Sequence, residues 1–167
     1  TLESGRELGY DTLVIALGSE VAYYGMPGVE EHAFTLKTLH DADRINRAVA
    51  GMMRGRDKPL RVTLGGGGAT GVELSAMLAE KLSTWQAGMH LTLVETAPVV
   101  LCGFPEKVSV YAREQLERRG VKILTGTAIT QAKDRSVVLE DGTELAHDIL
   151  IWNGGTQAPA ILGTLPF

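Results

Sequence analysis

A run of glycines after a short apolar segment constrains this chain more than any other feature. Gly66, Gly68 and Gly71 occupy the three glycine positions of the pattern G-x-G-x-x-G. In a strand–turn–helix unit the first permits a tight turn, the second lets backbone approach a pyrophosphate, and the third allows helix and strand to pack closely. The helix that follows directs free N–H groups and its positive dipole end toward the phosphates. A flexible linker can also be glycine-rich, so the flanking residues decide.

The flanking residues predict regular structure on both sides of the turn. Alternating apolar residues over 60–64 predict a strand, and apolar stripes over 72–85 predict a helix. A second strand is predicted over 90–95. Because a linker has no such flanks, the sequence predicts a phosphate-binding turn. Its residues are Gly66, Gly67, Gly68, Ala69, Thr70 and Gly71.

Glu95 ends the second predicted strand and adds a preference to this site. It follows Gly71 at close to the separation of ~20 residues expected for the acid that binds the adenosine ribose hydroxyls. A carboxylate there repels a 2′-phosphate, and no Lys or Arg lies between Lys81 and Lys107. The sequence therefore favours NAD over NADP. The alternative is a solvated carboxylate at a strand end.

Composition excludes several other classes of protein. The 167 residues carry a net charge of −4, so no strongly basic surface is expected to attract nucleic acid. No apolar run reaches the ~20 residues that span a bilayer, and no signal-peptide pattern is present. The single Cys102 excludes an internal disulfide or redox-active cysteine pair and suits a reducing compartment. The four histidines show no metal-ligand spacing, so no metal site is expected.

The other segments complete an α/β pattern with a parallel sheet and a β-meander. A helix capped by Thr38 is predicted to run to about Met53, and another to begin at Pro105 and Glu106 and stop at Gly120. Strands are predicted over 121–124 and 149–153, and a meander over 128–133, 136–140 and 143–146.

An internal repeat indicates how these elements are organised. Residues 1–18 match residues 138–155 at a constant offset of 137, with eight shared identities and no gap. Both copies predict a hairpin that turns at Ser-Gly or Asp-Gly, followed by an apolar strand that ends on glycine. Two generic hairpins would also look alike, but eight ungapped identities favour duplication. The chain is thus expected to be a fragment that holds the end of one nucleotide-binding domain and most of a second.

Several motifs resemble one known family. The chain is similar to the FAD-dependent pyridine nucleotide-disulfide oxidoreductases, flavoproteins with two dinucleotide-binding domains, and most similar to type II NADH:quinone dehydrogenases. It departs from their pattern at Asn153-Gly154, where Thr-Ala is usual, and at Cys102, where Pro is common, which leaves the substrate branch open. The motifs that carry the resemblance are residues 10–19, 32–37, 66–74, 93–95, 103–105 and 151–155.

The resemblance implies an organisation and further site residues. Residues 1–30 would be the last hairpin and strand of the FAD-binding domain with a linker, 31–155 the Rossmann-like NAD(H)-binding domain, and 156–167 the return to the FAD domain. Glu73 would lie near the meeting point of nicotinamide and flavin, as a catalytic candidate. The other interpretation of Glu73 is a first-turn carboxylate stabilised by the helix dipole. Gly155 would border the nicotinamide, and Ala16 and Gly18 would touch FAD.

The implied activity is hydride transfer from NADH to FAD, with electrons passing on to a quinone-type acceptor. NAD(H) is the cofactor expected in this chain, whereas FAD belongs to the full-length protein and is not expected to be retained here. The implied location is cytoplasmic, on the cytoplasmic face of a membrane through a C-terminal segment outside this chain, and a homodimer is compatible with the family. Alternatives are a ferredoxin-reductase- or NADH-oxidase-type flavoprotein, or a non-catalytic NAD-binding module that senses redox state.

Overall fold

The computed structural model describes residues 4–82 and 88–164, and the chain divides into two compact units. Val21–Gly155 forms one unit, and Thr1–Glu20 together with Thr156–Phe167 forms the other. The larger unit contains the sheet, the helices that cover it and the glycine turn, residues 66–71. This unit positions the candidate site.

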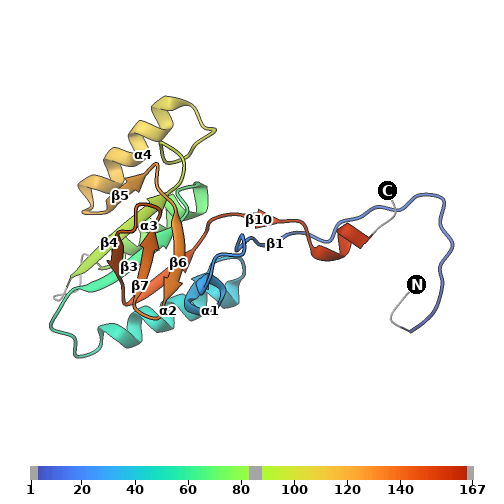
Figure 1. Cartoon of the computed structure of the whole chain (residues 1–167), viewed down its shortest axis with the longest axis horizontal. Coiled ribbons are helices and arrows are strands. Elements are labelled where there is room, and N and C mark those ends of the chain that lie inside the picture. The colour runs from blue at the N-terminus through green and yellow to red at the C-terminus, as the bar shows by residue number, and fades with distance from the viewer. Residues whose placement is uncertain (1–3, 83–87, 165–167) are drawn as a thin grey trace. The chain divides into compact units, whose positions relative to one another are not determined.

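A five-stranded parallel sheet is the frame of the larger unit (Figure 1). Its strand order is β2-β9-β3-β4-β5, so β3 lies at the centre. β3, which precedes the glycine turn, pairs with β4, the next strand after it. Thr63 of β3 is in register with Leu150 of β9 and with Thr92 of β4. The bounds are β2 Ala33–Thr35, β3 Leu60–Gly65, β4 Met89–Glu95, β5 Lys122–Thr125 and β9 Ile149–Trp152.

Three helices share one apolar core with one face of this sheet. They are α2 (Leu39–Met53), α3 (Ala69–Leu82) and α4 (Glu106–Arg118). Alternate residues of the central strands, such as Leu64 and Leu93, are fully buried against them. Burial of a side chain of this size stabilises the fold by about 1.5–3 kcal/mol. The helices thus hold the carboxyl ends of β3 and β4 in a fixed place.

A β-meander covers the opposite face. Its strands β6 (Ile129–Lys133), β7 (Ser136–Leu139) and β8 (Glu144–Ala146) pair antiparallel in sequence order. A second core joins them to the sheet, with Val137 fully buried and Trp152 nearly so. The short helix α1 (Val29–His32) contributes Val29 to the same core. The parallel sheet and meander confirm the predicted fold class.

Most of the predicted elements of this unit are confirmed, with small differences at their ends. Thr38 caps α2 through a capping box, in which its hydroxyl accepts from Asp41 N–H and the Asp41 carboxylate accepts from Thr38 N–H. Helix α3 begins three residues earlier than predicted, at Ala69 directly after the glycines, and predicted residues 83–85 lie outside the described residues. The strand β2 and the helix α1 were not predicted.

The prediction for the first copy of the repeat is wrong. The second copy forms β7, β8 and β9 as expected, but residues 6–19 form no helix or strand in the described chain. Their apolar side chains are exposed, Val14 to 82%. A strand needs partners for its backbone N–H and C=O groups and a layer to cover its apolar face. β9 has β2 and β3 beside it and a core on each face, whereas residues 6–19 have neither.

The smaller unit has little regular structure of its own. It includes β10 (Thr156–Gln157) and the 3-10 helix η1 (Ala160–Thr164), and β10 pairs with β1 (Glu20–Val21). Ala16 and Gly18, predicted to mark a strand end, are exposed and lie in an irregular segment. Among the described residues of the whole chain, every helix is too short or too polar to cross a membrane.

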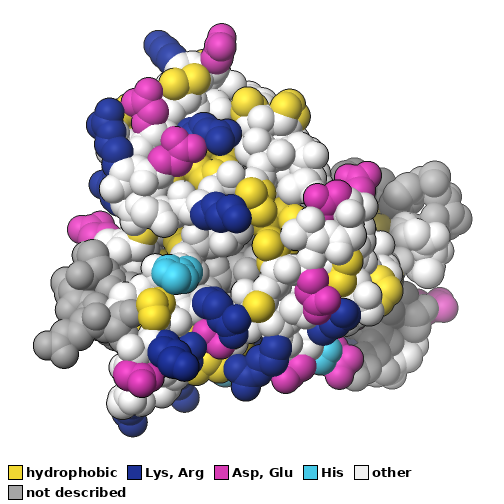
Figure 2. Space-filling model, turned by 60° about the vertical axis from the view of Figure 1, so that its left-hand side comes forward, with side chains coloured by type: hydrophobic (Ala, Val, Ile, Leu, Met, Phe, Trp, Pro, Cys, Tyr) yellow, Lys and Arg dark blue, Asp and Glu magenta, His cyan; other side chains and the backbone are white. Residues whose placement is uncertain are grey.

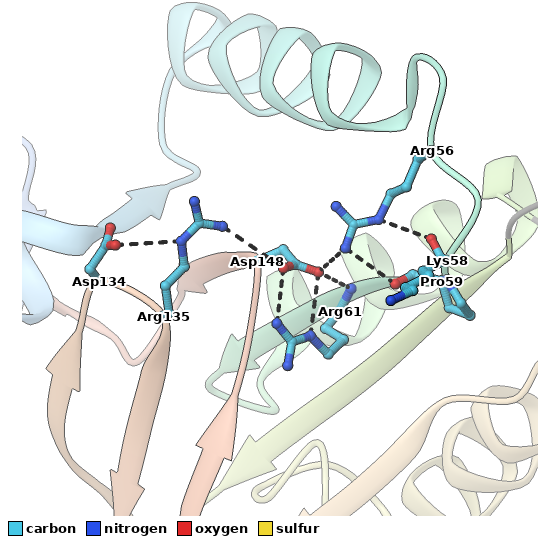
Figure 3. A network of polar contacts seen from close by, with 7 residues as sticks. All are labelled: Arg56, Lys58, Pro59, Arg61, Asp134, Arg135 and Asp148. Atoms are coloured by element: carbon cyan, nitrogen blue, oxygen red, sulfur yellow. Dashed lines mark hydrogen bonds and ion pairs between the residues drawn. The ribbon is translucent and has the colours of Figure 1, made fainter.

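Asp148 anchors the amino ends of the central strands (Figure 3). Its carboxylate side chain is only 6% exposed and accepts from Arg56 Nη2 at 2.6 Å and from Arg61 Nη2 at 3.0 Å. Arg61 N–H donates to the same carboxylate at 2.9 Å, and the Arg135 guanidinium lies 3.9 Å away. Burial alone would raise the pKa of Asp148, but the hydrogen bonds and charges of Arg61 and Arg56 outweigh it and lower the pKa.

The neighbouring His147 is buried with weaker support, because the Ser136 backbone and the Asp148 charge favour its charged form but do not outweigh burial. It is 1% exposed, and neither ring nitrogen has a hydrogen-bond partner among the described residues. Burial is the main cause that lowers its pKa, because the charged imidazolium would lose its hydration. The unfolded chain therefore binds a proton at a higher pH than the folded chain.

We expect this histidine to make the fold sensitive to mild acid. Because its pKa is lower in the folded state, stability should fall as pH drops below the unfolded value of about 6.5. In urea unfolding, His147→Leu should reduce the change in the free energy of unfolding between pH 7.5 and pH 5.5. It should also raise that free energy by about 1 kcal/mol at pH 7.5, since it removes buried polar atoms that have no hydrogen-bond partner. His40→Gln, at an exposed position on α2, should keep the wild-type slope. An unchanged slope in His147→Leu would contradict this expectation.

Candidate functional site

The glycine turn lies between β3 and α3, at the carboxyl edge of the sheet. Gly66 has φ +106°, a conformation that side-chain-bearing residues rarely adopt. A Cβ on Gly66 would overlap the Asn153 carbonyl, and a Cβ on Gly71 would overlap the Gly66 carbonyl oxygen. Gly68 is exposed, with open space where a Cβ would be. Two glycines thus permit the turn, while the third leaves the backbone approachable.

The start of α3 continues directly from this turn. Val72 N–H donates to Gly68 C=O at 3.0 Å, so the first helical hydrogen bond reaches back to the turn. Ala69 and Thr70 are exposed in the first turn of the helix. The free N–H groups of a helix start favour an anion such as a phosphate.

Glu95 closes the other side of the turn. Its Oε2 accepts from Gly67 N–H at 2.5 Å, and its Oε1 accepts from Ala97 N–H at 2.7 Å and from the Thr96 hydroxyl at 3.0 Å. These bonds hold the carboxylate beside the glycines at the end of β4. A Cβ on Gly67 would meet the Glu95 Cβ at 2.9 Å, so glycine is needed for this approach. The predicted acid and the predicted turn are therefore in direct contact.

A cavity of about 330 Å³ opens beside Gly66 and Glu95. Trp152 lines it and is held by its indole N–H, which donates to Ala22 C=O at 2.8 Å. Tyr24 also lines it, and its hydroxyl donates to Gly154 C=O at 3.3 Å. The remaining lining residues are Met26, Gly65, Val94, Thr96, Thr127, Ala128, Ile129 and Gly154.

Sequence reasoning missed several of these lining residues. Tyr24 has φ +52° in a Gly- and Pro-rich turn far from the glycine motif in sequence. Thr127 comes from the connection between β5 and β6. No local pattern marks either one. The only available signal was that each is next to a glycine, Tyr24 before Gly25 and Thr127 after Gly126, in connecting segments of the kind that often carry binding residues.

The other predicted residues occupy different surroundings. Gly155 has φ +136°, and a Cβ there would lie 2.6 Å from the Tyr24 hydroxyl. Glu73 is exposed on α3. Ala16 and Gly18 belong to the smaller unit. Within the described residues no group of His, Cys, Asp and Glu could hold a metal ion.

Charge is mixed on the face that Figure 2 draws. Figure 2 shows Lys and Arg side chains interspersed with Asp and Glu, so no patch of one sign covers this face. Arg47 pairs with Asp43, and Arg113 with Glu117, each one helical turn apart. Such exposed pairs contribute about 0.2–1 kcal/mol each.

Comparison with known proteins assigns the family. The sequence profile described as pyridine nucleotide-disulphide oxidoreductase matches residues 1–162. The chain belongs to this family. It is 30% identical over 184 aligned positions to an internal alternative NAD(P)H-ubiquinone oxidoreductase A1 of Solanum tuberosum, covering 99% of this chain and 37% of that protein. It is 30% identical to the type II NADH:quinone oxidoreductase of Haemophilus influenzae, covering 93% of this chain and 42% of that protein.

A solved structure shows the same fold. The Plasmodium falciparum NDH2 structure in complex with NADH superposes with a TM-score of 0.84 at 24% identity, over 95% of this chain and 38% of that one. The chain thus spans less than half the length of these relatives.

Proposed function

We propose that residues 31–155 are the NADH-binding domain of an FAD-dependent oxidoreductase that passes hydride from NADH to FAD and electrons on to a quinone-type acceptor. The contact between the glycine turn and Glu95, at the carboxyl edge of a parallel sheet, carries the proposal. In open α/β sheets this edge is where dinucleotides bind. Two relatives named as NAD(P)H or NADH quinone oxidoreductases support the acceptor class.

The residues present fit a dinucleotide. The N–H groups of Gly68, Ala69 and Thr70 would bind the pyrophosphate, and Gly66, Gly67 and Gly71 give the turn its shape. Glu95 would accept hydrogen bonds from the adenosine ribose hydroxyls at the rim of the cavity. When bound, the nucleotide supplies a hydride, and the protein positions the ring and excludes water.

The remaining assignments follow the family organisation. Residues 1–30 would belong to the FAD-binding domain, with Ala16 and Gly18 at the flavin, and 156–167 would lead back to that domain. Gly155 would border the nicotinamide. Glu73 would lie near the junction of nicotinamide and flavin. FAD would be bound by the longer protein and not by this chain alone.

The location and assembly of the longer protein belong to the same proposal. Quinone is soluble in the bilayer, so the longer protein would act at a membrane surface, on the cytoplasmic face and through a C-terminal segment, as a homodimer. Flotation of the longer protein with lipid vesicles tests this attachment. Failure to float would contradict it.

Nucleotide preference tests the proposed site most sharply. In calorimetric titration we expect NADH to bind about tenfold or more tightly than NADPH, because the Glu95 carboxylate repels a 2′-phosphate. Glu95→Gln should weaken NADH binding and narrow this preference. Glu114→Gln removes the same charge at an exposed position on α4, and it should leave the NADH affinity and the preference for NADH unchanged.

Two outcomes would contradict the proposal at different levels. Equal or tighter NADPH binding by the wild-type chain would overturn the role of Glu95. Binding of neither nucleotide would overturn the NADH-binding function itself.

A further inference from the structure

A loop distant from the glycines in sequence contacts the turn directly. The segment 98–104 follows β4 and precedes α4. Within it Leu101 N–H donates to Gly67 C=O at 2.8 Å. Gly67 N–H is already bound to Glu95. The backbone N–H and C=O of Gly67 are therefore both held by other parts of the protein.

This contact sets the direction of the next backbone donor. A trans peptide is planar, and its C=O and N–H groups point in opposite directions. With Gly67 C=O turned toward Leu101, the N–H of Gly68 points away from segment 98–104. Gly68 is exposed, and a Cβ built on it would meet no atom within 4 Å. The loop thus orients the peptide whose N–H is available to a phosphate.

Leu101 is itself held in an unusual conformation. Its φ is +53°, in the left-handed region, while its side chain is 8% exposed. The left-handed conformation costs a leucine roughly 1–2 kcal/mol, so surrounding contacts must stabilise it. Phe104 N–H closes the turn by donating to Leu101 C=O at 2.9 Å. The conformation is the one that presents the Leu101 N–H to the glycine turn.

Helix α4 supplies the support behind Leu101. The buried Ser109 hydroxyl donates to Val100 C=O at 2.6 Å, and Val100 is 1% exposed. Ser109 is 5% exposed, so this hydrogen bond is shielded from water. A shielded bond of this kind is costly to lose because the carbonyl stays buried without a donor.

We propose that segment 98–104 is a clamp that fixes the glycine turn in its phosphate-binding form, with Leu101 and Ser109 as positioning residues. The inference rests on the proposed NADH-binding function and adds residues outside the fingerprint to it. Ser109 holds Val100, Val100 places Leu101, and Leu101 orients the Gly67–Gly68 peptide.

Binding of three probes to Ser109→Ala tests the clamp. The affinities for NADH and ADP-ribose, which contain a pyrophosphate, should each fall about tenfold, a change that corresponds to ~1.4 kcal/mol. The affinity for adenosine, which has none, should stay within about twofold. The control is Ser136→Ala, which removes a part-buried hydroxyl hydrogen bond to the Glu144 carboxylate in the meander. It should leave all three affinities unchanged.

A pair of Leu101 variants separates backbone positioning from packing. Valine keeps most of the side-chain volume but is β-branched and disfavours a positive φ. Glycine has no side chain but adopts a positive φ readily. Leu101→Val should therefore weaken NADH binding more than Leu101→Gly. A purely packing role predicts the reverse order and would overturn the clamp.

The remaining outcomes distinguish the two proposals. If the wild-type chain binds NADH and Ser109→Ala binds it with the same affinity, the clamp alone is overturned. An equal loss for adenosine and NADH would also overturn it, because the effect would not depend on the pyrophosphate. Absence of NADH binding by the wild-type chain would overturn the proposed function and the clamp together.

Discussion

Gly71→Ala should remove NADH binding and destabilise the fold by about 3 kcal/mol. The added Cβ would overlap the carbonyl oxygen of Gly66, which is backbone and cannot rotate away as a side chain would. Overpacking at a well-packed site costs about 1–3 kcal/mol, occasionally more, and here the glycine turn must open to make room. Urea unfolding and calorimetric titration with NADH measure the two effects.

Gly51→Ala is a matched control for this change. Gly51 lies in α2, exposed, with nothing within 4 Å of an added Cβ. Alanine should stabilise the helix there by about 0.5–1 kcal/mol and leave NADH affinity unchanged. Wild-type stability and affinity in Gly71→Ala would show that the turn does not need its third glycine.

Asp148→Asn should lower the free energy of unfolding by about 3 kcal/mol near neutral pH. The change leaves the Arg56 and Arg61 guanidiniums beside a neutral, nearly buried amide, and breaking a buried ion pair by removing one partner costs ~3–5 kcal/mol. We expect a value at the lower end because Arg61 is 44% exposed. Asp43→Asn, in an exposed pair on α2, should cost less than about 1 kcal/mol.

The same substitution should change the response to strong acid. Since the pKa of Asp148 is lowered in the fold, its contribution is present above the unfolded value of about 3.9 and is lost as pH falls through the lower folded value. Urea unfolding between pH 7 and pH 3 should therefore show a smaller loss for Asp148→Asn than for wild type. Parallel curves would exclude Asp148 as a source of this acid dependence.

Local sequence patterns predicted most of the larger unit for a clear reason. Strand 60–64 and the helix from Thr38 to Met53 have strong periodicity, an identifiable cap or turn at their ends, and a core on the side that the pattern indicates. Strand β2 was missed because three residues carry no periodicity. Its backbone conformation comes from pairing with β9, where Ala33 is in register with Leu150.

The repeat shows the limit of such patterns. Residues 1–18 and 138–155 share eight identities, yet only the second copy forms strands in the described chain. A hairpin sequence specifies a turn and an alternation of side chains, but a stable strand also needs a neighbouring strand and a covered face. The larger unit provides both for the second copy alone.

By itself, the sequence determined the position of the glycine turn, the acid that lies beside it and the fold class, because glycine spacing and alternation act over short distances along the chain. The tertiary structure alone decided which distant groups complete the site. A positive φ places Tyr24 at the site, and an indole hydrogen bond holds Trp152 there. A loop contact brings Leu101 to the glycine turn. These contacts depend on the packing of separate elements around one sheet edge, and no local spacing encodes them.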